Sequence, residues 1–165
     1  GLTKTGAGKL YIGGLNTFTG NVNLFEGEIQ VGGTAAIPGT ATNAFLSGLL
    51  ATPAGNASSA WNLANGTTLR FLTTNTTVYN TPLIIGDGAI ILDTGNLGVL
   101  QFDDDSTNYH GDITFNGGTI RSGATNGLGN VRGLFNVNGN VNFIFSAAVT
   151  NNKVCLLYTS PSPRD

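Results

Sequence analysis

The chain has 165 residues, which is enough for one domain with one continuous hydrophobic core. Only 10% of the residues are charged and the formal net charge is −2, so the chain lacks the basic surface that nucleic-acid binding requires. Disorder combines low hydrophobicity with high net charge, whereas 40% of this chain is hydrophobic. No apolar run approaches the roughly 18 residues of a membrane-spanning helix.

The composition favours β-structure. The 25 glycines and 20 asparagines are poor helix formers and separate short runs of valine, isoleucine, phenylalanine and threonine. In most of these runs apolar and polar residues alternate, so each run can bury one face. In chain order the expected strands are residues 10–12, 22–24, 29–31, 69–71, 83–85, 89–92, 100–102, 113–115, 119–120, 135–137 and 141–145.

The expected strands are too short to support a meander of hairpins on their own. Short strands suit a solenoid, in which each strand pairs with its equivalents in the coils above and below. The Gly-Gly, Asn-Gly and Asp-Gly pairs between the strands permit sharp corners, but hairpins use the same pairs. The turn chemistry alone therefore leaves a β-sandwich and a β-helix open.

Residues 34–64 interrupt the strand pattern and are expected to form an insertion that projects from the stack. Asn43 can cap a single helical turn that Pro53 ends. We expect Trp61 to pack the insertion down onto the core; the alternative is an exposed platform on which a sugar stacks.

Residues 1–33 contain a dense motif of the form Leu-x-Lys-x-Gly-x-Gly-x-Leu, then Asn-Thr-aromatic-Thr-Gly, then Gly-x-Ile-x-Val. The slots are filled by Leu2, Lys4, Gly6, Gly8, Leu10, Asn16, Thr17, Phe18, Thr19, Gly20, Gly27, Ile29 and Val31. The motif resembles the autotransporter-associated β-strand repeat, also called the passenger-associated repeat. The resemblance covers about a fifth of the chain but fills nearly every slot of the family pattern.

The resemblance implies a right-handed parallel β-helix that is secreted and displayed on the bacterial cell surface. At about 20–25 residues a coil, residues 1–154 would make six or seven coils in a rod roughly 30 Å long. Asparagines at equivalent corners can form hydrogen-bonded ladders, and low charge avoids repulsion between like charges in neighbouring coils. The family implies further coils beside this segment and an outer-membrane β-barrel; a sorting tail in its place would indicate a secreted repeat protein without its own pore.

Residues 155–165 differ in composition from the rest, because the Gly/Asn/Thr pattern stops and the only cysteine, Cys155, appears. The string resembles the in-frame translation of a sequencing-library adapter, so we expect an artefactual, disordered tail. The alternative is a genuine Pro-rich linker. On the first interpretation Cys155 has no redox or metal role, and no cofactor is implied elsewhere in the chain.

The only acidic cluster consists of Asp103, Asp104 and Asp105. Adjacent carboxylates in a loop can bind Ca²⁺, which takes six to eight oxygen ligands. Neither EF-hand spacing nor the calcium-binding nonapeptide repeat is present, so the three residues are only weak metal candidates. A solvated loop is the preferred interpretation.

Other catalytic arrangements find little support. His110, the only histidine, could join Ser106 or Ser122 in a triad, but no nucleophile-elbow motif is present. Glu26 and Glu28 could imitate a glycosidase pair, but they occupy outward slots and are expected to be solvated. We therefore predict no enzymatic activity and no catalytic residues.

The leading functional prediction is a structural or adhesive stalk of an autotransporter-like surface protein, with a ligand that the sequence does not name. One alternative is a β-helix enzyme that degrades polysaccharides, which needs carboxylates and basic residues on one exposed sheet face. The other is a calcium-dependent adhesin centred on Asp103, Asp104 and Asp105.

Overall fold

The computed structural model describes residues 1–12, 20–32, 60–72, 78–81, 83–93, 99–102, 104–124, 126–129, 133–145 and 154–157. All regular structure in these ranges is β-strand. The strands are β1 (Leu2–Lys4), β2 (Lys9–Ile12), β3 (Val22–Leu24), β4 (Glu28–Val31), β5 (Ala60–Leu63), β6 (Thr68–Phe71), β7 (Val78–Thr81), β8 (Leu83–Gly86), β9 (Ala89–Leu92), β10 (Val99–Phe102), β11 (Ile113–Phe115), β12 (Gly118–Ser122), β13 (Leu134–Val137), β14 (Val141–Phe145) and β15 (Val154–Leu157).

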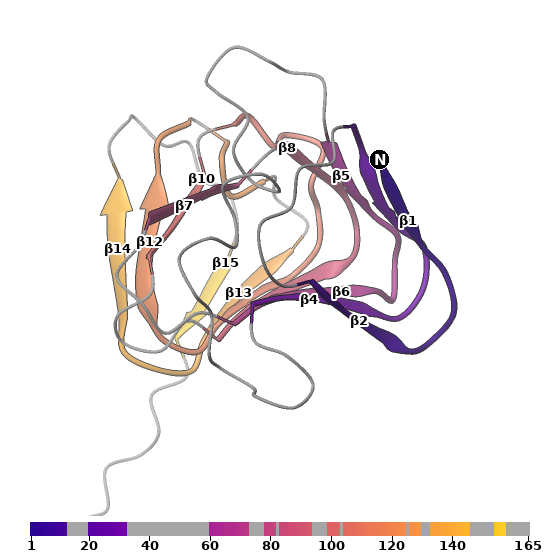
Figure 1. Cartoon of the computed structure of the whole chain (residues 1–165). Helices are drawn as coiled ribbons and strands as arrows, with labels where there is room; N and C mark the ends of the chain where they lie inside the picture. Colours follow the sequence, from indigo (N-terminus) through magenta and orange to yellow (C-terminus); the bar gives the residue numbers. More distant parts are fainter. Residues whose placement is uncertain are drawn as a thin grey trace, which may run out of the picture.

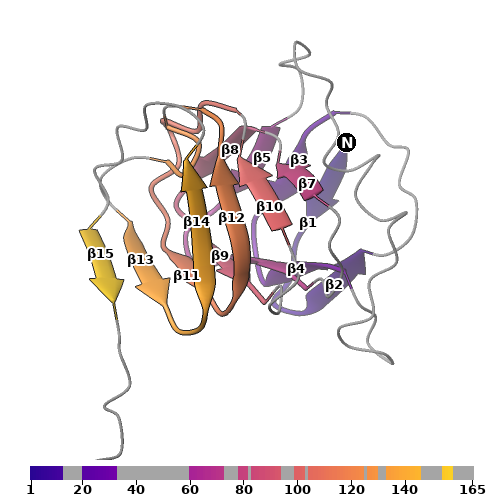
Figure 2. The ribbon, with the colours of Figure 1, turned by 90° about the vertical axis from the view of Figure 1, so that its left-hand side faces the viewer.

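The strands form three parallel sheets in a β-solenoid, which confirms the predicted fold class (Figure 1). Sheet A has the order β1-β3-β5-β8, sheet C the order β14-β12-β10-β7, and sheet B the order β15-β13-β11-β9-β6-β4-β2. Strands β1 to β4 alternate between sheets A and B, β5 to β10 pass twice through sheets A, B and C, and β11 to β15 alternate between sheets B and C. Figure 2 shows the levels in sequence order, from the indigo N-terminal strands to the yellow C-terminal ones.

The number of turns is smaller than expected. Counted by the two four-stranded sheets, the solenoid makes about four turns, and only sheet B reaches seven strands. The expectation of six or seven coils assumed a uniform coil length. Most register partners are indeed about 20–23 residues apart. Between β3 and β5, however, Val22 pairs with Trp61, so one turn uses almost twice that length. In addition, the strands of sheet A lie between residues 2 and 86 and those of sheet C between residues 78 and 145, so neither sheet accompanies every level of sheet B.

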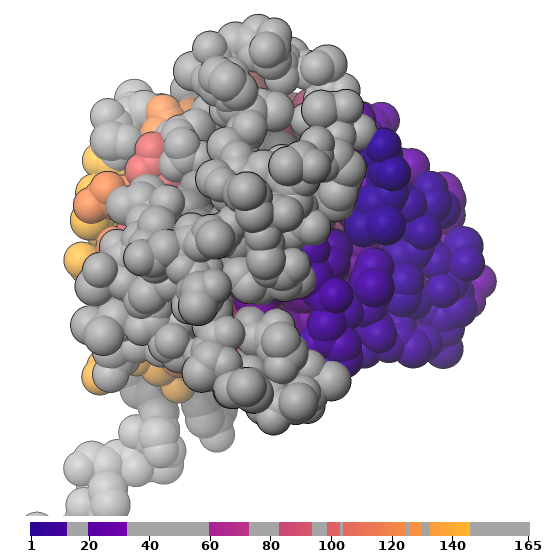
Figure 3. Space-filling model, in the orientation of Figure 1, coloured from indigo at the N-terminus to yellow at the C-terminus, as the bar shows by residue number. Residues whose placement is uncertain are grey.

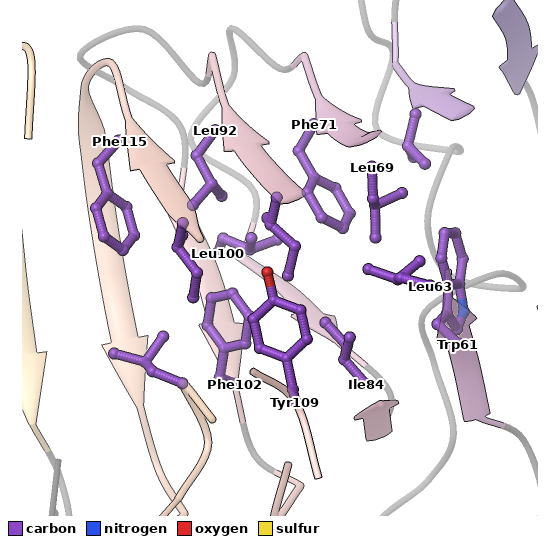
Figure 4. Close-up of a cluster of buried hydrophobic side chains, with 14 of the residues drawn as sticks. Trp61, Leu63, Leu69, Phe71, Ile84, Leu92, Leu100, Phe102, Tyr109 and Phe115 are labelled. Carbon is purple, nitrogen blue, oxygen red and sulfur yellow. The ribbon is translucent and has the colours of Figure 1, made fainter. Parts of the chain in front are cut away.

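The expected insertion ends earlier than residue 64. Ala60–Leu63 form β5 in the stack, and Trp61 is only 2% exposed. The ring lies among core side chains in Figure 4, so it is not an exposed platform for a sugar. The helical turn expected after Asn43, and Pro53, lie outside the described residues.

Inward-facing side chains stack in columns along the solenoid. In sheet B one column consists of Ile29, Leu69, Ile90, Ile113 and Phe135, and the next of Val31, Phe71, Leu92, Phe115 and Val137. Most of these residues are completely buried, and Figure 4 shows Phe71, Leu92 and Phe115 side by side on neighbouring strands. Burying one such side chain contributes about 1.5–3 kcal/mol, so the columns are the main source of stability.

The eleven strands expected from alternation are all present, with ends that differ by a residue or two. Alternation missed β1, β5 and β7. It also missed β15, which pairs with β13 and extends through residue 157. The structure therefore does not separate the expected foreign tail from the stack at residue 154, and residues 158–165 lie outside the described residues.

Close stacking requires glycine at the corner between β3 and β4. Gly27 has a φ of 74°, and a Cβ at this position would lie 2.4 Å from the carbonyl oxygen of Gly8 in the preceding level. Gly66, the corner glycine between β5 and β6, has a similar φ of 80° but no atom within 4 Å of its Cβ position. The two glycines thus share the backbone requirement and differ in the space available.

Substituting these glycines separates the two effects. We expect Gly66→Ala to lower the free energy of unfolding by about 1 kcal/mol, because only the left-handed backbone is disfavoured. Gly27→Ala should cost about 2–4 kcal/mol, because the methyl group also pushes two levels apart. Urea unfolding followed by circular dichroism measures both. Equal losses of unfolding free energy in the two variants would show that the close contact between levels does not contribute to stability.

Candidate functional site

The outer side of sheet B carries a charge ladder formed by Lys9, Glu28, Arg70 and Asp93. Lys9 Nζ lies 2.9 Å from Glu28 Oε1, and Arg70 Nε donates to the same oxygen at 2.9 Å. Arg70 Nη1 pairs with Asp93 Oδ2. Positive and negative charges therefore alternate over four levels, which avoids the repulsion expected of like charges in a stack.

The ladder continues with amides at equivalent corners. Asn116 Nδ2 donates to Asp93 Oδ1, and Asn138 Nδ2 donates to Asn116 Oδ1 at 3.1 Å. In sheet A, Asn62 Nδ2 donates to Asn23 Oδ1 at 2.6 Å. The bond between Asn138 and Asn116 is the pairing predicted for asparagines at equivalent corners, whereas Asn23 and Asn62 lie within β3 and β5.

The position of Glu28 corrects one expectation. Glu26 is exposed as expected, although it lies in the corner before β4 and not on a strand. Glu28 begins β4, and its side chain is only 20% exposed and bonded to two cations. Burial alone would lower the pKa of the Arg70 guanidinium. The hydrogen bonds and charges of Glu28 and Asp93 outweigh this effect and raise the pKa above its ordinary value. Glu28 is thus a structural ion-pair partner and is not half of an open carboxylate pair.

Substituting Arg70 should show how much the charge ladder contributes to the free energy of unfolding. Arg70→Gln leaves two carboxylates without their shared cation, so we expect the free energy of unfolding to fall by about 1–2 kcal/mol at low salt. Salt near 1 M screens the charges and should narrow the difference. Arg121→Gln, at an outward position of β12, is the matched control. A loss no larger than in the control would mean that the ladder does not stabilise the fold.

A row of equivalent corner positions runs along the turn from sheet A to sheet B, at the right of Figure 1. We call Thr5, Phe25, Ala64, Asp87 and His110 the corner row. The same backbone bond recurs at each level: Phe25 N to Lys4 O (3.0 Å), Ala64 N to Leu24 O (2.9 Å), Asp87 N to Leu63 O (2.9 Å) and His110 N to Gly86 O (2.9 Å). These side chains therefore project outward one level apart, about 4.8 Å along the stack.

An open recess of about 530 Å³ lies beside Asp87 and His110. It forms because only two residues, Asp87 and Gly88, connect β8 to β9, whereas four residues connect β5 to β6. Asp87 Oδ1 lies 3.6 Å from His110 Nδ1, and the Asp87 side chain is 60% exposed. Asn65, Thr68 and Asp112 also line the recess. The Asp112 carboxylate accepts a hydrogen bond from Leu134 N at 2.8 Å.

Tyr109 forms the floor beneath this corner and is 1% exposed. Its hydroxyl lies 3.0 Å from the carbonyl oxygens of Gly88 and Asp112, which share its one proton. Burial raises the pKa of Tyr109 well above its ordinary value, and the negative charge of Asp112 adds to the shift. The side chain therefore stays neutral in the folded protein.

The raised pKa predicts a loss of stability in alkali. An unfolded tyrosine ionises near pH 10, whereas buried Tyr109 keeps its proton, so the unfolded state binds fewer protons above that pH. The free energy of unfolding should therefore fall as the pH rises above about 10. Urea unfolding between pH 8 and 11 measures the slope, which Tyr109→Phe should reduce. An unchanged slope in Tyr109→Phe would contradict the assignment.

The serines considered with His110 are not available as nucleophiles. Ser106 is 2% exposed and its Oγ accepts a hydrogen bond from Ile84 N at 3.2 Å. Ser122 is 1% exposed and its Oγ donates to Ala124 O at 3.1 Å. A nucleophile must reach its substrate, so neither serine forms a working triad with His110.

The acidic cluster can be described only in part, because Asp103 lies outside the described residues. Asp104 is half-buried, while Asp105 is exposed and accepts hydrogen bonds from Thr107 N (3.1 Å) and from the Thr107 hydroxyl. The hydroxyl bond is the main reason why the pKa of Asp105 is lowered. Among the residues that the structure places, no three His, Cys, Asp or Glu side chains gather as a metal site would require.

The motif of the first 33 residues occupies structural positions. Ile29 and Val31 are buried in β4, and Leu2 and Leu10 pack against the core from β1 and β2. Lys4 Nζ donates to the carbonyl oxygens of Thr5, Gly6 and Glu26, which joins two corners. Gly6, Gly20 and Gly27 have positive φ, whereas Gly8 does not. Asn16, Thr17, Phe18 and Thr19 lie outside the described residues.

Comparison with models of known protein families, with curated proteins and with solved structures gives no match. The resemblance to the passenger-associated repeat therefore stays a prediction. Within the described ranges, the structure has no helix of the length and apolarity needed to cross a membrane.

Sequence reasoning missed both the charge ladder and the corner row. Members of each lie about 20 residues or more apart, and the long connection before β5 shifts the register for every later level. Aligning the strands on their inward-facing residues would have revealed both features. That alignment needs the true position of β5, which the sequence pattern concealed.

Proposed function

We propose that this chain is a structural spacer, a stalk segment of a secreted, autotransporter-like bacterial surface protein. The observation that carries the proposal is the parallel solenoid itself, with apolar columns inside and paired polar ladders outside. A stack of this kind extends along one axis and separates whatever is attached to its two ends, because each level contacts only its neighbours. The motif of residues 1–33 supports the surface location.

The polar groups on the outside are largely used within the stack. Glu28, Arg70 and Asp93 bond to one another, and Asp112 bonds to Leu134 N. Asp87 and His110 form an ionisable pair that faces an open recess. Internal pairing of this kind favours a structural role over hydrolysis, which needs carboxylates free to exchange protons with a substrate.

Surface display tests the proposal. The full chain, with an epitope tag at its N-terminus, is placed between a signal peptide and an outer-membrane translocator in a Gram-negative host. We expect the tag to be detected on intact cells and the displayed segment to resist protease, because a parallel solenoid exposes few flexible backbone sites. Gly27→Val, which forces two levels apart, should reduce both signals.

Two results would contradict the stalk. One is retention and degradation of the full chain inside the cell while a known passenger is displayed by the same translocator. The other is release of sugars from a polysaccharide panel that Asp87→Asn or His110→Ala abolishes. The second result would favour the polysaccharide-degrading alternative.

A further inference from the structure

The corner row contains a gap where a small residue lies between two large ones. Ala64 separates Phe25 from Asp87, so these two side chains lie two levels, or about 10 Å, apart along the stack with little between them. The gap opens into a groove of about 400 Å³. Its lining includes Phe25, Asn62, Ala64, Ile85, Asp87 and Asn108.

Phe25 is 55% exposed, whereas most large apolar side chains of the described residues are buried. It is fixed on a corner whose backbone is bonded to the level before it, Phe25 N to Lys4 O at 3.0 Å. Strands β1 to β4 form a continuous indigo to purple surface on the right of Figure 3. The ring is therefore an exposed aromatic side chain on a rigid support, which is a common element of binding sites.

Polar groups lie on the other side of the gap. The Asp87 carboxylate is 60% exposed and is a hydrogen-bond acceptor, and His110 follows at the next level, 3.6 Å away. Asn62 donates through Nδ2 to Asn23, and this bond fixes the orientation of the Asn62 amide group, including its oxygen. Asn108 adds a second amide at an exposed position. An aromatic ring with a few convergent polar groups is the usual composition of a small-molecule site.

A sugar chain matches this arrangement. The C–H face of a pyranose ring packs on an aromatic face, and its hydroxyl groups bond to carboxylates and amides. An aromatic ring beside a carboxylate would also suit an ammonium ion. The neutral amides of Asn62 and Asn108, and the histidine beside Asp87, favour the uncharged ligand, since Asp87 is the one carboxylate among the groove residues.

We propose that the groove between Phe25 and Asp87 binds a neutral oligosaccharide along the solenoid axis, with one sugar ring packed on Phe25. The next sugar would lie over Ala64, and its hydroxyl groups would bond to Asp87 and the flanking asparagines. This proposal goes beyond the proposed function, because a structural spacer needs no ligand of its own. It is tested on purified protein, so its failure is distinguishable from a failure of surface display.

The experiment titrates the folded full chain with cellohexaose, chitohexaose and maltohexaose, monitored by calorimetry or by chemical shifts. We expect saturable binding of at least one hexaose. Phe25→Ala should weaken that binding about tenfold or more, as loss of an aromatic anchor commonly does. Ala64→Phe should abolish binding by filling the gap. Asp87→Asn should weaken it several-fold, since a charged acceptor bonds more strongly than a neutral one.

Tyr11→Ala is the matched control, because Tyr11 is another exposed aromatic residue, at 40%, that does not line the groove. It should leave the affinity unchanged, and each variant is checked for cooperative unfolding. Absence of hexaose binding at millimolar concentration overturns the proposal. So does equal binding by Phe25→Ala, or binding of tetramethylammonium in place of the hexaoses.

Discussion

In-register parallel pairing is the constraint on which the rest of the structure depends. Each strand of sheet B pairs residue for residue with its neighbours, from Lys9 opposite Glu28 to Leu134 opposite Val154. Side chains at equivalent positions must then lie directly above one another. The residue type that a position accepts therefore depends more on the equivalent positions in the adjacent levels than on its neighbours in the sequence.

This constraint explains both the composition of the chain and its exceptions. Inward positions form apolar columns, and corners approach one another so closely that Gly27 has no room for a side chain. Charges would repel if like stacked on like, and the few that are present alternate in sign from Lys9 through Glu28 and Arg70 to Asp93. The ladder ends in asparagines, whose amides both donate and accept and can therefore repeat without alternation.

The same geometry determines where a ligand could be recognised. In the part of the chain that the structure describes, the interior of the solenoid is filled by the side-chain columns. Hollows arise on its outside where one level is shorter than its neighbours, as at Asp87, or where a small residue lies between large ones, as at Ala64. Binding would therefore follow a row along the axis, and rigid stacking would keep the spacing of its groups constant.

The sequence by itself determined the all-β class, the position of most strands and the pairing of asparagines at equivalent corners. Alternation of apolar and polar residues is a local property, and strands such as Ile113–Phe115 show it within three residues. The motif of residues 1–33 also predicted a regular strand and corner pattern for that segment, and its Ile29 and Val31 lie in the core.

Only the tertiary structure decided which residues become neighbours across levels. The long connection before β5 placed Trp61 opposite Val22, which no local pattern could reveal. The pairing of β6 between β4 and β9 then brought the Arg70 side chain within reach of Glu28 and Asp93. The corner row of Phe25, Ala64, Asp87 and His110 likewise exists only after stacking. The physical reason is that parallel pairing couples residues through the coil length, and the coil length is a property of the whole turn.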